Sequence, residues 1–442
     1  MTLHALPPIP AERFQARRAA VFERLGNGVM VLPASPVQRS SRDTERPYVP
    51  DRELHYLTGL TDPESLGVLV GGSEPELVIF VRERDPDAEL WAGPRLGPEA
   101  VAELVGSGGC HPLSEMGERL PELLGRGDRI HFRPGRGGPV EQYVLDALER
   151  ARERGQRTGS GPRGILDPGE ILDDLRLVKD EHEIECIRAA CRVTIDGQRA
   201  GARAILPGVG EWVVEAAIEG AFRMAGAEGP GFDTIVGSGA NACILHYVAN
   251  GACVLEGGLV LIDAGAQVAL YHGDVTRTYP AAGSFTGPQR DVYTIVEIAL
   301  GAAVDTVRPG ATIGDVHDAT VRSLTGGLAD LGVLKGDTDG LIEQGAYKPF
   351  FPHQTSHWLG LDVHDPGDYT RHGEPRRLAP GMVFTVEPGL YFRPDVCEDR
   401  AAAFTGIGVR VEDDVAVTDT ACEVLTASLP TGAAEVEALV GR

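Results

Sequence analysis

Residues 257–280 read GGLVLIDAGAQVALYHGDVTRTYP, a stretch that sets two acidic side chains among apolar, strand-like runs. The run that starts after Gly257 ends at Asp263, and the next strand-like stretch, residues 271–276, carries Asp274. Short apolar runs between glycines are typical of β-strands. We therefore expect two strands that deliver both carboxylates to one place, because alternate side chains of a strand share a face.

A second pair of segments repeats this arrangement later in the chain. Residues 381–387, GMVFTVE, end at Glu387, and residues 408–414, GVRVEDD, carry Glu412. Two hairpins that face each other across a pseudo-two-fold axis would point four carboxylates at one cleft. We interpret Asp413 and Asp414, which follow Glu412, as ordinary surface residues.

Carboxylates that converge in this way need a cation to neutralise them, and two divalent ions would do so. A single acid at the end of a strand is usually solvated, but an acid that ends a run of four or five apolar residues is poorly placed for solvent. Ligands dominated by oxygen favour manganese, with cobalt or zinc as substitutes. The predicted ligands are Asp263, Asp274, His357, Glu387 and Glu412.

The order and spacing of these segments resemble aminopeptidase P, a pita-bread metallopeptidase whose wider family includes prolidases, creatinases and methionine aminopeptidases. The resemblance also covers the N-terminal half, through RPYVPDRELHYLTGLTDPES (46–65) and ELWAGPRLG (89–97). It implies a catalytic domain built on a curved antiparallel sheet with pseudo-two-fold symmetry. The segments that carry it in the C-terminal half are LIDAG and DVTRTYP (261–280), HQTSHWLGLDVHD (353–365), EPGLY (387–391) and GVRVEDD (408–414).

The resemblance implies a role for each ligand. Asp274 and Glu412 would bridge both metals, Asp263 would bind one of them, and His357 with Glu387 would complete the other. A hydroxide that bridges the metals would attack the peptide carbonyl, because two ions lower the pKa of a water they share. Glu387 would take the proton from the water and pass it to the leaving proline nitrogen.

Further residues fall where the resemblance places catalytic and substrate contacts. His364 is expected to stabilise the oxyanion, and His353 to act beside it. His246 and His353 would line the pocket for the proline ring, with Tyr391 and Arg410 near it. Alternatives stay open: a lone histidine often has a hydrogen-bonded structural role, and Arg410 could form a salt bridge that orients the carboxylates.

Three local patterns in these segments could mislead. Gln354 and Thr355 follow His353, where relatives often have glycine after the histidine, so the pocket shape stays open. His353 and His357 are four residues apart, as in a zincin helix, but Gln354 cannot replace the glutamate base of that motif. Residues 237–242, GSGANA, loosely fit a dinucleotide-binding pattern, but no helical period follows, so we interpret them as a loop of the substrate wall.

Composition excludes some partners. The 442 residues are 42% hydrophobic and 24% charged, with a net charge of −24. That charge argues against nucleic acid or an anionic membrane as a partner. No apolar stretch has the length of a signal peptide or a membrane span, which favours a cytoplasmic protein. Seven cysteines without paired spacing are interpreted as buried thiols.

The chain divides into a small mixed α/β domain over residues 1–173 and a catalytic domain over residues 174–442. An Asp180–Glu183 capping box predicts the start of a helix in the second domain. Residues 151–164 predict an exposed loop before the boundary. Other expected strands are 28–33, 66–71, 76–81 and 129–133, and other expected helices are 98–105, 139–154, 211–225, 289–307 and 313–332, the last three packed outside the sheet.

The first domain holds none of the predicted ligands, so we expect it to shape access, size selection or assembly. By the same resemblance, Trp91 would reach the active site of a neighbouring subunit. A homo-oligomer, dimer or tetramer, is therefore expected.

Together these features predict an Xaa-Pro aminopeptidase, which removes the first residue of peptides that have proline second. A prolidase, restricted to Xaa-Pro dipeptides, shares the ligand set, although the ELW and RPY segments favour aminopeptidase P. A creatinase-like enzyme would not need this dense cluster of ligands. A non-catalytic pita-bread binding module is a different class, and such a module would have lost metal ligands.

Overall fold

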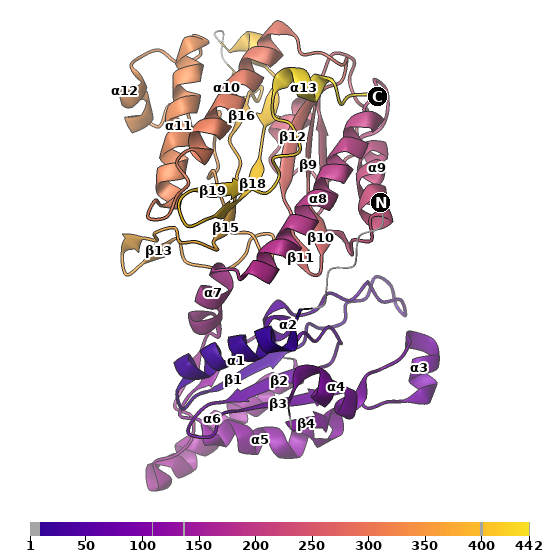
Figure 1. The fold of residues 1–442 in the computed structure, drawn as a ribbon, viewed down its shortest axis with the longest axis vertical. Coiled ribbons are helices and arrows are strands. Elements are labelled where there is room, and N and C mark those ends of the chain that lie inside the picture. Colours follow the sequence, from indigo (N-terminus) through magenta and orange to yellow (C-terminus); the bar gives the residue numbers. More distant parts are fainter. Residues whose placement is uncertain (1–8, 108, 136–137, 398–400, 442) are drawn as a thin grey trace. The chain divides into compact units, whose positions relative to one another are not determined.

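The computed structural model describes residues 9–107, 109–135, 138–397 and 401–441. The chain forms two compact units, Pro7–Leu175 and Arg176–Arg442, here called the N-terminal and the C-terminal unit. Figure 1 shows both, coloured along the sequence. No helix of the described residues is long and apolar enough to cross a bilayer.

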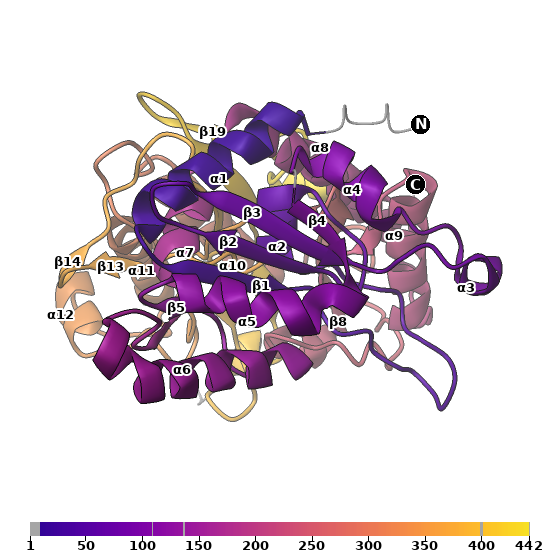
Figure 2. The same cartoon turned by 90° about the horizontal axis from the view of Figure 1, so that it is seen from below.

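The N-terminal unit is built on a sheet with the strand order β4-β3-β2-β1-β5-β6. Helices α5 and α6 lie along one face of this sheet, and α1 and α4 lie along the other (Figure 2). Both faces are covered, which is why β2 is buried along its whole length. The strands are β1 (Val29–Pro33), β2 (Leu66–Val70), β3 (Glu76–Val81), β4 (Gly109–Pro112), β5 (Ile130–His131) and β6 (Ile165–Leu166); the helices are α1 (Ala11–Leu25), α2 (Arg52–Thr58), α3 (Pro86–Ala92), α4 (Gly97–Val105), α5 (Met116–Arg126) and α6 (Pro139–Thr158).

The loop predicted over residues 151–164 is wrong in its first half. Helix α6 continues to Thr158, because residues 151–158 contain alanine, arginine, glutamate and glutamine, and one glycine costs only about 1 kcal/mol in a helix. The helix ends at Gly159, whose φ of 70° is the left-handed conformation that stops helices.

Helix α8 (Glu181–Ala204) starts at the predicted capping box. The Asp180 side chain accepts from the Glu183 N–H, and the Glu183 carboxylate accepts from the Asp180 N–H, each at 3.0 Å. The predicted helices 211–225, 289–307 and 313–332 are observed as α9 (Glu211–Met224), α10 (Gly287–Val304) and α11 (Ile313–Asp330). Figure 1 shows α8 and α9 on one side of the strands of this unit, and α10 and α11 on the other.

The hairpin predicted from residues 257–280 is present. Strand β9 (Leu259–Ala264) pairs antiparallel with β12 (Val275–Pro280), with Asp263 opposite Thr276, and β8 (Ile235–Ser238) lies on the other side of β9. In the second half, β15 (Val383–Val386) pairs with β18 (Asp413–Val417), and β16 (Gly389–Tyr391) pairs with β17 (Gly408–Arg410). Glu387 therefore lies in the short gap between β15 and β16, and Glu412 lies in the gap between their pairing partners β17 and β18.

The remaining elements are short. Helix α7 (Gly169–Leu177) spans the boundary between the units. The others are β7 (Gly229–Pro230), η2 (Gly239–Cys243), β10 (Ala266–Val268), β11 (Tyr271–His272), α12 (Thr338–Glu343), β13 (Thr370–Arg371), β14 (Glu374–Pro375), η3 (Ala402–Phe404), β19 (Cys422–Val424) and α13 (Ala433–Glu437), with η1 (Leu113–Glu115) in the N-terminal unit.

The prediction that all cysteines are buried holds only in part. Cys186, Cys191 and Cys243 are buried, but Cys253 is exposed, because it lies in the loop before β9 rather than on a packed face. All seven are free thiols.

One buried arginine joins the two halves of the C-terminal unit. Arg277 on β12 is fully buried, and its Nη2 donates to Asp413 Oδ1 at 2.8 Å. The same guanidinium donates to the carbonyl oxygens of Glu412 at 2.6 Å and Pro430 at 2.9 Å. It therefore ties β12 to the strand segment that carries Glu412.

Replacing Arg277 by methionine should strongly destabilise the protein. The Asp413 carboxylate would stay buried without its partner, which typically costs about 3–5 kcal/mol. Urea unfolding would measure the change. The control is Arg322→Met, which breaks the exposed Arg322–Asp339 pair and should cost about 0–1 kcal/mol. Equal effects of the two substitutions would contradict this account of Arg277.

Candidate metal centre

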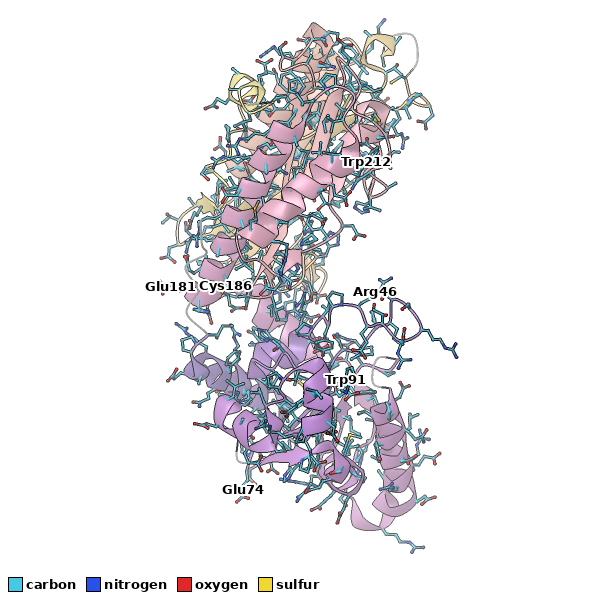
Figure 3. The ribbon with its side chains drawn as sticks, turned by 90° about the vertical axis from the view of Figure 1, so that its right-hand side faces the viewer. Arg46, Glu74, Trp91, Glu181, Cys186 and Trp212 are labelled. Atoms are coloured by element: carbon cyan, nitrogen blue, oxygen red, sulfur yellow. The ribbon has the colours of Figure 1, made fainter. Side chains whose placement is uncertain are left out.

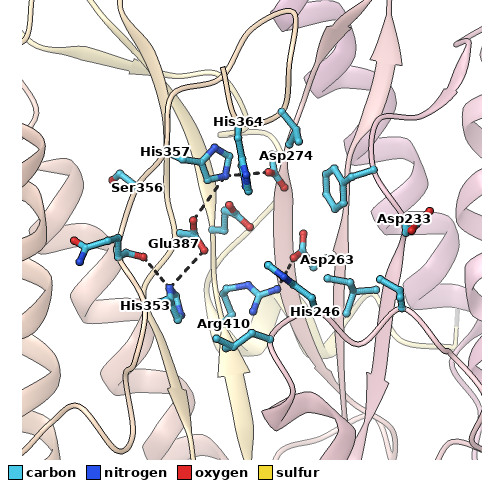
Figure 4. A pocket seen from close by; sticks show the side chains of 17 residues that line it. Asp233, His246, Asp263, Asp274, His353, Ser356, His357, His364, Glu387 and Arg410 are labelled. Carbon is cyan, nitrogen blue, oxygen red and sulfur yellow. Dashed lines mark hydrogen bonds and ion pairs between the residues drawn. The ribbon is translucent and has the colours of Figure 1, made fainter. Parts of the chain in front are cut away.

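All five predicted ligands line one cavity of about 480 Å³ in the C-terminal unit. Figure 4 shows Asp263 and Asp274 on one side of this cavity, and His357 and Glu387 facing them from the other. His246, His353, His364 and Arg410 line the same cavity. The ligand-bearing segments, from residue 263 to residue 412, are thus brought together by the fold.

The turn between the first two carboxylates is tight. A side chain on Gly265 would place its Cβ 2.0 Å from the Gly273 carbonyl oxygen, so only glycine fits there. This close approach lets Asp263, near the end of β9, and Asp274, just before β12, face the same cavity.

The ligand atoms converge to within metal-binding distances of each other. His357 Nε2 lies 3.4 Å from Asp274 Oδ2 and 3.8 Å from Glu387 Oε1. One ligand atom each from Asp274, His357 and Glu412 lie within 4.8 Å of one another. Glu412 is oriented by Thr276, whose hydroxyl donates to Glu412 Oε2 at 2.5 Å.

The charge in this cavity is unbalanced. Burial and the neighbouring carboxylates raise the pKa of Asp274 and of Glu412 well above the ordinary values. Burial also raises the pKa of Glu387 to about 7. Among the residues that line the cavity, Arg410 is the one arginine or lysine, and it is bonded to Asp263. A single guanidinium cannot neutralise four carboxylates.

Two buried carboxylate oxygens supply a direct test of whether metal ions fit. Asp263 Oδ1 and Asp274 Oδ1 are buried and have no hydrogen-bond partner among the residues that the structure describes. Buried polar atoms are normally hydrogen-bonded, so each such exception needs an explanation. Both atoms belong to predicted ligands, and carboxylate oxygens suit hard divalent cations. The residues present therefore fit a metal site.

Two histidines of the cavity, His353 and His364, have lowered pKa values, which favours their neutral rings. His353 Nε2 lies 2.9 Å from the Tyr391 hydroxyl, and burial lowers the pKa of His353 to about 3. His364 packs edge-on against His357 with the ring centroids 4.3 Å apart. Burial, and then the charge of His357, lower the pKa of His364. A neutral imidazole can still donate one N–H to substrate.

Two predicted contact residues lie outside the cavity lining. Tyr391 is buried, and its hydroxyl accepts from Arg410 Nη1 at 3.0 Å. Trp91 lies on α3 of the N-terminal unit, where Figure 3 labels it. Its side chain is 89% exposed. Both alternatives given for Arg410 are observed together. Its side chain lines the cavity and also forms a salt bridge with Asp263.

The interpretation of Asp413 and Asp414 as surface residues is wrong, since both are buried. Strand β18 pairs with β15 along one edge and with β19 along the other, and its side chains are buried along its whole length. Asp413 pairs with Arg277, and Asp414 Oδ2 accepts from the Asp274 N–H at 2.9 Å and from Cys191 Sγ at 3.2 Å. Burial raises the pKa of Asp414 to about 7.

The apolar side of the cavity was missed from the sequence. Its signal was the apolar character of residues 232–236 and 243–248, FDTIV and CILHYV, beside the histidine. The apolar lining residues are Phe232, Ile235, Leu245, Val248 and Val363.

Both rejected motifs are absent from the described structure. Strand β8 leads into the 3₁₀ turn η2, not into an α-helix that could hold a pyrophosphate. Residues 353–357 form an irregular segment, so His353 and His357 do not share a helix face.

Comparison with known proteins agrees with this geometry. Residues 185–419 match metallopeptidase family M24, and residues 14–131 match the N-terminal domain of aminopeptidase P. The Xaa-Pro aminopeptidase of Escherichia coli (strain K12) is 40% identical over 98% of each chain, and that of Haemophilus influenzae is 36% identical over 100% of each.

Solved structures extend the agreement to the fold. Pseudomonas aeruginosa aminopeptidase PepP and a variant of Escherichia coli aminopeptidase P in complex with substrate each superpose with a TM-score of 0.92, at 40% identity over 98% of both chains. This confirms the predicted mixed α/β domain followed by a pita-bread domain. The chain therefore belongs to the Xaa-Pro aminopeptidases of metallopeptidase family M24.

Proposed function

We propose that this enzyme releases the N-terminal residue from peptides that have proline in the second position. The observation that carries the proposal is the convergence of four carboxylates and His357 on one cavity, with two orphaned carboxylate oxygens. The activity printed for the relatives, Xaa-Pro aminopeptidase, supports the same substrate.

Asp263, Asp274, His357, Glu387 and Glu412 would hold two divalent ions. When bound, the ions would act as Lewis acids toward the scissile carbonyl and lower the pKa of water. We propose manganese as the native metal, because the ligands are mostly carboxylates. Asp274 and Glu412 are the proposed bridging ligands, a proposal supported by the approach of one ligand atom from each, and one from His357, to within 4.8 Å of one another.

Glu387 is the proposed carrier of the proton. Its pKa of about 7 in the metal-free site suits a group that accepts and returns a proton near neutral pH. Thr385 Oγ1 lies 3.4 Å from Glu387 Oε1, and His353 Nδ1 lies 3.8 Å from Oε2. These neighbours would help to hold the carboxylate in place for the proton transfer.

The histidines that line the cavity have separate proposed roles. His364 would donate to the developing oxyanion, since its ring packs against that of the predicted ligand His357, with the ring centroids 4.3 Å apart. His353 and His246 would contact the proline ring, with Arg410 beside them. Tyr391 would act through His353, whose ring it orients, rather than by touching the substrate.

We further propose that residues 174–442 are catalytic, and that residues 1–173 control access and assembly. Exposed Leu90 and Trp91 on α3 support a role in contacts between subunits of a dimer or tetramer. The seven free thiols support a cytoplasmic location, where cysteines stay reduced.

Assays on metal-loaded protein separate the proposal from its alternatives. We expect release of the first residue from both Xaa-Pro dipeptides and longer Xaa-Pro-Xaa peptides. Cleavage of dipeptides alone would indicate a prolidase. Absence of cleavage in both cases, with metal bound, would favour the non-catalytic binding module.

The substitution Glu387→Gln should lower kcat by roughly 100-fold or more, because glutamine cannot carry the proton. Circular dichroism should show an unchanged fold. The control is Glu423→Gln, which breaks a half-buried ion pair with Arg188; neither residue lines the cavity. A Glu387→Gln enzyme with near-normal kcat would contradict the proposed role of Glu387 in proton transfer.

Metal should stabilise the protein more at neutral than at acidic pH. Burial raises the pKa of Glu387 from 4.5 to about 7, so in the metal-free protein its favourable contribution is present below 4.5 and is lost as the pH rises through 7. Manganese replaces the proton and removes this loss. Thermal unfolding with and without manganese at about pH 5.5 and 7.5 should therefore give the larger rise in Tm at the higher pH. An equal rise at both pH values would contradict the assignment.

A further inference from the structure

The buried carboxylate of Glu211 organises the segment that forms one side of the active-site cavity. We call residues 232–248 the substrate wall. The wall carries most of the apolar lining of the cavity together with one histidine, and its lining residues include Ile235, Leu245, His246 and Val248.

Four donors from this segment and the loop after it converge on the one carboxylate. Glu211 Oε1 accepts from the Ser238 N–H at 2.7 Å and from Asn241 Nδ2 at 3.1 Å. Oε2 accepts from the Tyr247 hydroxyl at 2.9 Å and from the Ala252 N–H at 2.8 Å. The chain from residue 238 to residue 252 thus wraps around Glu211.

The arrangement is specific because Glu211 is fully buried and, among the described residues, forms no ion pair. A buried carboxylate without a counter-ion is costly unless hydrogen bonds replace its water. Here two donors serve each oxygen. Glu211 is also the first residue of α9, where the helix dipole favours negative charge. Moving any donor away would leave part of this charge unsatisfied.

The bond to Tyr247 is the one that reaches the cavity lining. Tyr247 lies between His246 and Val248, which both face the cavity but whose own side chains are exposed, Val248 to 49%. The Asn250 side chain contacts the early part of the wall instead: it accepts from the Val236 N–H and donates to the Thr234 carbonyl oxygen. The position of His246 and Val248 therefore depends on the Glu211–Tyr247 bond.

We propose that Glu211, acting through Tyr247, is a positioning residue that determines how the enzyme discriminates among substrate side chains. The inference rests on the proposed function, because the wall contacts substrate only if the cavity binds the peptide. If the substrate wall is already ordered in the free enzyme, substrate binding loses less conformational entropy. Releasing it should raise KM and change selectivity, whereas kcat should change little, because no metal ligand is touched.

The test compares Tyr247→Phe and Glu211→Gln with the parent enzyme, all full-length and loaded with manganese. The substrates are Xaa-Pro-Xaa peptides with alanine, leucine or phenylalanine first. The matched control is Tyr293→Phe, which removes a hydroxyl bond of the same kind, to the Thr431 carbonyl oxygen at 2.8 Å, away from the wall.

We expect Tyr247→Phe to raise KM by about threefold or more, and to change the ratio of kcat/KM between leucine and alanine peptides by roughly twofold or more. Metal content and kcat should match the parent. Glu211→Gln should have the larger effect, because its amide would set a donor against two of the four donors. Tyr293→Phe should lower Tm without moving KM or the ratio.

The proposal is overturned if Tyr247→Phe leaves KM and the ratio at parental values, or shifts them no more than Tyr293→Phe does. If Glu211→Gln fails to fold, Tyr247→Phe decides alone, because it removes one hydroxyl and keeps the carboxylate. A parent enzyme that cleaves none of the peptides would overturn the proposed function itself, a result that is distinct from unchanged selectivity in an active enzyme.

Discussion

The concentration of negative charge in one cavity is the constraint on which the rest of the C-terminal unit depends. Burial raises the pKa of Asp274, Glu387 and Glu412, so the site without metal favours protonated carboxylates. At neutral pH, cations that take the place of these protons would stabilise the ionised carboxylates. The fold therefore has to hold the carboxylates together against their mutual repulsion, ready for the ions.

Two buried arginines help to hold the carboxylates together. Arg410 contacts Asp263 directly, and its Nε donates to Thr276, whose hydroxyl in turn orients Glu412. Arg277 lies one residue further along β12, where strand alternation points it away from the cavity, toward Asp413. Strand β12 therefore has two roles. Its Thr276 orients the predicted ligand Glu412, and its Arg277 binds Asp413 in the second half of the unit.

The residues proposed for catalysis and those proposed for substrate selectivity lie on different sides of the cavity. Its polar side carries the predicted ligands together with His353, His364 and Arg410. Its apolar side is a loop segment without regular strands at its tip, and a single carboxylate, Glu211, gathers it. Substrate preference could therefore change through this wall without any change to the metal ligands.

The sequence by itself determined the strands beside the candidate ligands and predicted those ligands, because residue type and strand alternation are local properties of LVLIDA, MVFTVE and GVRVE. It could not show that α6 continues past residue 154 to Thr158, or that Asp413 and Asp414 are buried. The burial depends on which elements meet the two side chains, here β12 through Arg277 for Asp413 and α8 through Cys191 for Asp414. Only the tertiary structure brought Glu211, Tyr247 and Ala252 together, because their bonds join residues up to 41 positions apart, and no local pattern encodes a contact at that separation.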